Sequence, residues 1–222
     1  MIVVIGSAGL RGTGPDAGVN GMAALLAVAA SAAGSRVELI AKIGDDAAGD
    51  ELSLALTRAR VGHVATLRDA AHATRRLASP GGNDADLDLD ADLDTSRQAP
   101  AIDPGTIPLD GHADEPTLDG DDVDLALRYL TDYRVIVVAG ARGVDIVRVA
   151  AAAADWASAH LVVALPAGTT AAAGLPDAAL VVTAEDGDGG ALAGLLGVYA
   201  ARVDQGAPPA DAFTAFRQTV AP

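Results

Sequence analysis

The chain has 222 residues, of which half are hydrophobic and only 3% aromatic, and its formal net charge is −15. So acidic a surface excludes nucleic acid and anionic membranes as partners, because both depend on cationic contacts, and the lack of cysteine excludes disulfides and thiolate metal sites. The length fits one domain, whose core we expect to consist of Ala, Val, Leu and Ile with Trp156 as its single indole.

The first 60 residues predict alternating strands and helices. Residues 1–5 are a short apolar run that stops at Gly6, as a buried parallel strand does. Next we expect a helix over 21–33, a strand over 37–43 and a helix over 47–60, with Gly34 ending the first helix. This β-α-β-α order predicts a parallel sheet with right-handed crossovers.

The same pattern returns in the C-terminal half. The expected elements are a helix over 121–130, a strand over 135–139, a helix over 144–159, strands over 161–165 and 179–183, and final helices over about 191–203 and 208–219. Together they predict a single domain over residues 1–222, a three-layer α/β/α fold with a mainly parallel sheet.

A polar segment, residues 79–120, separates the two halves. It contains "NDADLDLDADLDT", in which aspartates alternate with other residues, and then the proline-rich "PAIDPGTIP". Converging carboxylates can bind calcium, but the glycine and the terminal glutamate of an EF-hand loop are missing. We therefore expect a flexible acidic and proline-rich insertion rather than a metal site.

The N-terminal segment "IVVIGSAGLRGTG" places glycines after a strand, which is compatible with a dinucleotide-binding loop. The spacing is G-x-x-G-x-x-G rather than G-x-G-x-x-G, and Glu38 lies within the second strand instead of at its end. Dinucleotide binding is therefore a minor alternative.

No feature of the sequence predicts export or membrane insertion. No apolar run reaches the roughly 18 residues of a membrane span, and "MIVVIGSAG" enters a strand without a basic leader. We expect a cytoplasmic protein.

Three segments, in the same order along the chain, carry a resemblance to a known family. They are "IAKIGDDAAGDEL", "LDGDDVDLALRYLTDYRVIVVAG" and "LVVALPAGTTAAAGLPDAALVVTAEDGDGGALAG". They resemble the ribokinase-like (PfkB-type) sugar and nucleoside kinases, in which a strand, a Gly-x-Asp turn and a helix are followed by an acidic motif. The resemblance covers most of the chain outside the Asp-rich insertion.

The resemblance implies ATP- and Mg²⁺-dependent phosphorylation of a hydroxyl on a sugar or nucleoside. It implies a substrate site made of Gly6, Ser7, Arg11, Asn20, Gly21, Gly44 and Asp45. It also implies that Glu185, Asp186 and Asp188 lie near the metal and that Asp188 is the catalytic base. Alternatively, these acids have only a structural role and form an acidic N-terminal cap of the next helix.

Several positions depart from the family pattern. Arg11 stands where the family has a sugar-binding Asp, and Leu25 stands where it has an Asn. The space for a lid hairpin is short, and the Gly-Ala-Gly-Asp anion hole is not found. These changes predict that kinase activity is impaired or lost. The alternative is a non-catalytic protein that binds a small molecule or serves in assembly, and a homodimer is compatible with either function.

Overall fold

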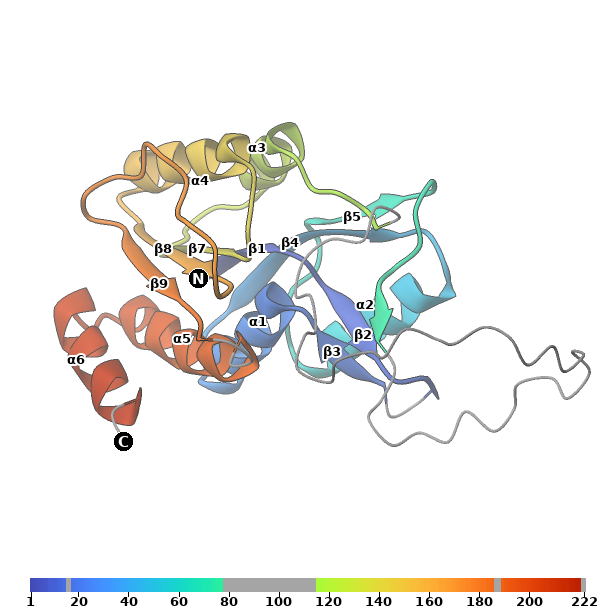
Figure 1. Ribbon diagram of the computed structural model, residues 1–222, viewed down its shortest axis with the longest axis horizontal. Helices are drawn as coiled ribbons and strands as arrows, with labels where there is room; N and C mark the ends of the chain where they lie inside the picture. The colour runs from blue at the N-terminus through green and yellow to red at the C-terminus, as the bar shows by residue number, and fades with distance from the viewer. Residues whose placement is uncertain (15–16, 78–114, 186–188, 221–222) are drawn as a thin grey trace, which may run out of the picture.

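A six-stranded, entirely parallel sheet forms the centre of the computed structural model, which describes residues 1–14, 17–77, 115–185 and 189–220 (Figure 1). Its strand order is β5-β4-β1-β7-β8-β9. The strands are β1 (Ile2–Gly6), β4 (Val37–Gly44), β5 (Thr66–Asp69), β7 (Val135–Ala139), β8 (His160–Leu165) and β9 (Leu180–Thr183). The predicted parallel sheet is confirmed, and β5 is a strand that the pattern of apolar residues did not predict.

Helices cover both faces of this sheet, as Figure 1 shows. One face is covered by α1 (Met22–Ala32), α2 (Ala47–Arg58) and α5 (Gly189–Asp204). The other face is covered by α3 (Gly120–Tyr129) and α4 (Val144–Ala157). The last helix, α6 (Pro209–Val220), packs against α5. Successive side chains of a strand point to opposite faces, so Ile2 and Val4 contact the α1 layer while Val3 and Ile5 contact the α3 layer. The predicted three-layer α/β/α fold is confirmed.

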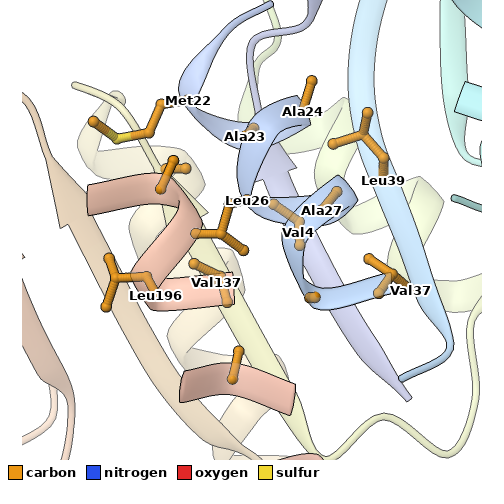
Figure 2. Close-up of a cluster of buried hydrophobic side chains, with 14 of the residues drawn as sticks. Val4, Met22, Ala23, Ala24, Leu26, Ala27, Val37, Leu39, Val137 and Leu196 are labelled. Atoms are coloured by element: carbon orange, nitrogen blue, oxygen red, sulfur yellow. The ribbon is translucent and has the colours of Figure 1, made fainter. Parts of the chain in front are cut away.

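Small residues let α1 and α5 lie side by side. A Cβ atom built on Gly197 would lie 2.7 Å from the Leu26 carbonyl oxygen and 2.6 Å from the Ala29 Cβ. Figure 2 shows Leu26 of α1 and Leu196 of α5 gathered with Val137 of the sheet, all three buried in one cluster. The alanine-rich composition therefore serves close helix-to-helix packing over the sheet.

A second, three-stranded sheet was not expected from the sequence. It has the order β3-β2-β6 and consists of β2 (Gly9–Arg11), β3 (Gly18–Asn20) and β6 (Arg76–Leu77), with β2 antiparallel to β3 and parallel to β6. The glycine-rich segment after β1 thus continues as a short hairpin, and α1 begins only after β3. A dinucleotide-binding loop instead passes directly from the first strand into a helix, so this arrangement does not favour that alternative.

The expectation that Trp156 belongs to the core is wrong. Its side chain is 87% exposed because Trp156 lies on the side of α4 that faces away from the sheet. Of the range 79–120 expected to be an insertion, residues 79–114 lie outside the described part of the chain, whereas Leu118 is buried and Gly120 begins α3. Over the residues that the structure describes, no helix is both long and apolar enough to cross a membrane.

Candidate functional site

The candidate site lies at the carboxyl end of β1, where open α/β sheets bind their ligands. Strand β1 ends at Gly6, Ser7 follows, and Gly21 caps the start of α1 with a φ of 97°. A Cβ atom on Gly21 would lie 2.7 Å from the Ser7 carbonyl oxygen. Only glycine therefore suits this position, both for its backbone conformation and for its close approach to the segment after β1.

Ser7 carries a polar atom that is left without a partner. Its Oγ is buried and makes no hydrogen bond to any described residue. A buried hydroxyl without a partner costs about 1–3 kcal/mol, so such an atom requires an explanation. A ligand that hydrogen-bonds Ser7 Oγ would remove this cost.

Arg11 and Asn20 meet across the hairpin formed by β2 and β3. Arg11 Nη2 donates a hydrogen bond to Asn20 Oδ1 at 3.4 Å, and Asn20 is only 4% exposed. Arg11 forms no ion pair with a residue in the described ranges. A guanidinium can donate hydrogen bonds but cannot accept them, so Arg11 can offer a ligand only donors and positive charge at this position.

Five of the residues predicted to bind substrate are therefore brought together. They come from one continuous stretch that runs from β1 through the hairpin to the start of α1, and they are Gly6, Ser7, Arg11, Asn20 and Gly21. The sequence pattern indicated these residues, but it did not indicate the hairpin that places Arg11 beside Asn20.

Gly44 and Asp45 belong to a different structure, the turn between β4 and α2. Asp46 caps α2: its Oδ1 accepts hydrogen bonds at 2.7 Å from the Gly49 N–H and at 2.7 Å from Thr74 Oγ1, and its Oδ2 accepts one from the Thr74 N–H at 2.9 Å. Asp45 is exposed. Burial raises the pKa of Asp46, but its hydrogen bonds to Thr74 and Gly49 outweigh burial and lower the pKa overall. These bonds assign the turn a structural role.

A second polar cluster, not indicated by the sequence, joins β4 to α3. Lys42, the single lysine, forms an ion pair with Asp122 at 2.9 Å, and the hydrogen bond to Asp122 is the main cause that raises the pKa of Lys42. Nearby, Asp69 accepts a hydrogen bond from the Ala71 N–H and pairs with His72 at 2.9 Å, and both contacts lower the pKa of Asp69. Each of these carboxylates already has a partner within the protein.

The predicted metal and catalytic acids are only partly described. Glu185 is exposed, and Asp186 and Asp188 lie outside the described residues. Across the described ranges, no three His, Cys, Asp or Glu side chains come close enough together to hold a metal ion. Helix α5 begins at Gly189, so the acidic run directly precedes a helix. We therefore derive no step that passes through a metal ion.

Comparison with known proteins identifies the fold. No protein-family model and no curated protein sequence matches the chain. Among solved structures, a putative ribokinase II from E. coli in complex with ATP and Mg²⁺ is 13% identical with a TM-score of 0.60, over 97% of this chain and 89% of the other. A protein called Sa239 is 12% identical with a TM-score of 0.58, over 100% and 94%. The chain therefore has the ribokinase-like, PfkB-type fold.

Other solved structures are longer than this chain. An uncharacterized sugar kinase from Pyrococcus horikoshii is 16% identical with a TM-score of 0.48, and the match covers 76% of this chain but only 53% of that kinase. The part of this chain that matches thus spans about half the length of that kinase. At these identities the similarity establishes the fold alone.

Proposed function

We propose that this protein binds a small hydroxylated molecule, a sugar or a nucleoside, at the carboxyl end of β1, and that its phosphorylation by ATP is impaired or lost. The observation that carries this proposal is the buried, unpartnered Oγ of Ser7, a residue whose backbone carbonyl approaches Gly21 closely. A ligand hydroxyl can both donate to and accept from this serine. The ribokinase-like fold supports a ligand of this class.

Arg11 gives the proposed site its selectivity. The family pattern has a carboxylate here, which accepts hydrogen bonds from sugar hydroxyls, whereas Arg11 only donates. Asn20 holds the guanidinium through the contact at 3.4 Å, and Asn20 is itself buried. We therefore expect the bound molecule to present carbonyl, carboxylate or phosphate oxygens to Arg11 and a hydroxyl to Ser7.

The impaired phosphoryl transfer follows from what that reaction requires. It depends almost entirely on positioning and charge stabilisation, and the family's anion-hole motif is not found in the sequence. In an active chain, Asp188 would be the base and would lie with Glu185 and Asp186 near Mg²⁺, which neutralises phosphate charge.

The rival function is a non-catalytic assembly protein. For any of these functions we propose a cytoplasmic protein without nucleic-acid or membrane partners, in keeping with its charge of −15.

A thermal-shift panel tests the proposal. The full chain is heated with neutral and acidic sugars, nucleosides, NAD(P), and ATP with Mg²⁺. We expect at least one sugar or nucleoside to raise the Tm, and we expect both Ser7→Ala and Arg11→Ala to abolish this shift. Arg217→Ala is the matched control, since Arg217 is an exposed arginine on α6, and it should leave the shift unchanged.

The same panel separates the alternatives. If no sugar or nucleoside stabilises the chain, the binding site is refuted. If NAD(P) alone does so, the dinucleotide alternative is favoured. Phosphorylation of any panel member with ATP and Mg²⁺, abolished by Asp188→Asn, would show that catalysis survives.

A further inference from the structure

The outer surface of α3 and α4 exposes more large hydrophobic side chains than any other part of the structure. Half of those that are exposed among the described residues lie on these two helices: Leu125, Tyr129, Val144 and Trp156. Tyr129 is 78% exposed and Trp156, the only tryptophan of the chain, is 87% exposed. Concentrated exposed hydrophobic residues mark interaction surfaces, and Trp and Tyr contribute most to binding energy in protein interfaces.

A hollow of about 760 Å³ lies on the same surface. It is formed by the C-terminal parts of α3 and α4 and by the segment 130–133 between α3 and β7, and its apolar walls include Leu127, Leu130, Val149 and Ala153. Trp156 lies at this hollow and faces solvent. The surface therefore has both a projecting aromatic ring and a concave apolar site that can receive one.

The charges around this hollow balance, unlike those of the whole chain. Its walls include Asp124, Arg128, Asp132 and Arg148, two acids and two bases, whereas the chain carries −15. Arg128 pairs with Asp124 on the same helix. Asp132 and Arg148 form no ion pair with a described residue. Arg148 contributes to lowering the pKa of Asp145 on the same helix, but both side chains can still form an ion pair with another molecule.

We propose that this surface, which we call the α3–α4 face, binds a second copy of the same chain in a two-fold dimer. A two-fold interface brings the same patch together twice, so the patch must be complementary to itself. The hollow on the α3–α4 face meets this condition: Trp156 of each copy enters the hollow of the other, and the two acids and two bases that line the hollow sum to zero charge. A hollow lined by an excess of acids would repel its own copy.

The position of this face separates it from the proposed ligand site. The segment 130–133 precedes β7 and so lies at the amino end of the sheet, whereas Gly6 and Ser7 lie at the carboxyl end of β1, which is parallel to β7. Dimerisation through the α3–α4 face therefore leaves the site at the end of β1 open. The two proposals can fail independently.

Light scattering and tryptophan fluorescence of the full chain test the dimer. We expect a mass of about twice 22.0 kDa, and on dilution a shift to monomer together with a red shift of Trp156 emission as the indole enters water. Trp156→Ala removes two indoles per dimer, each worth about 30-fold in affinity, so the dissociation constant should rise on the order of 1,000-fold. Val64→Ala, which removes an 81% exposed valine outside this face, should leave it unchanged.

Charge variants test the balance on the α3–α4 face. Arg148→Asp leaves the walls of each hollow with an excess of acids and should weaken the dimer, and adding Asp132→Arg should restore it because the walls of the hollow are again balanced. Moderate salt should strengthen the wild-type dimer, because it screens repulsion between two acidic chains. A chain that stays monomeric up to millimolar concentration, a dimer that is insensitive to Trp156→Ala, or a small molecule that quenches Trp156 without any change in mass each overturns the proposal.

Discussion

The packing of α1 against α5 leads to a prediction in which two glycines of one helix respond in opposite directions. At Gly197 a Cβ atom would lie 2.7 Å from the Leu26 carbonyl oxygen, 2.8 Å from the Ala30 backbone nitrogen and 2.6 Å from the Ala29 Cβ. Two of these atoms belong to the backbone of α1, so no side-chain rotation relieves the contact. At Gly194, on the same helix, nothing lies within 4 Å.

The size of each effect follows from two opposing contributions. Replacing a helical glycine by alanine stabilises the helix by about 1 kcal/mol. Overpacking a well-filled interface costs about 1–3 kcal/mol, and we take the upper value for Gly197 because the neighbouring atoms are backbone. Gly197→Ala should therefore lower the free energy of unfolding by about 2 kcal/mol, and Gly194→Ala should raise it by about 1 kcal/mol.

Urea unfolding followed by circular dichroism measures both variants, with the slope checked against wild type. For a chain of this length, 1 kcal/mol corresponds to about 2–4 °C in Tm, so we expect a fall of about 4–8 °C for Gly197→Ala and a rise of about 2–4 °C for Gly194→Ala. If Gly197→Ala is as stable as Gly194→Ala, then α1 and α5 do not lie as close together as the structure places them.

Three further predictions concern hydrogen bonds and titration. Asp46→Ala removes a helix cap and leaves the Thr74 N–H without its acceptor, so it should cost about 3 kcal/mol in urea unfolding, whereas the exposed neighbour Asp45→Ala should change stability by less than about 0.5 kcal/mol. Ser7→Ala removes an unpartnered buried hydroxyl, so stability should stay equal or rise by up to about 1 kcal/mol while ligand-induced shifts disappear; a loss of stability would mean that the hydroxyl has a partner within the protein. Burial lowers the pKa of His160, so the unfolded chain takes up its proton first and stability should decline as the pH falls below about 6.5. His160→Gln should flatten that decline between about pH 7.5 and 5.5, and an unchanged slope would refute this assignment.

Local patterns predicted most of the large elements. The apolar runs of β1, β7 and β8 are buried on both faces, as parallel strands between two helical layers must be, and this is why they could be recognised without a partner strand. The small sheet of β2, β3 and β6 escaped prediction for a physical reason. Its strands are two or three residues long, too short for any periodicity, and β6 pairs with a strand more than 60 residues earlier in the chain.

The candidate site likewise combines features that are local in the sequence with contacts between residues far apart in the chain. The glycines and the cap at Asp46 are local features and could be inferred from neighbouring residues, whereas the contact of Asp46 with Thr74 at 2.7 Å joins residues 28 positions apart. Similarly, Arg11 was recognised as a departure from the family pattern, but its contact with Asn20 depends on the hairpin. The fold class was therefore predictable and the chemistry of the site was not.

Trp156 shows most clearly how the two levels of information differ. Composition alone favours a buried position for the only indole in an aromatic-poor chain. The hydrophobic pattern predicts a helix over 144–159, which the structure has as α4, Val144–Ala157. Which side of that helix meets the sheet depends on the packing of α4 against α3 and β7, and that packing directs Trp156 toward solvent. Sequence periodicity thus determined the elements and their layers, because it reflects local burial. Only the tertiary structure decided which side chains remain without a partner, because that depends on contacts between residues far apart in the chain.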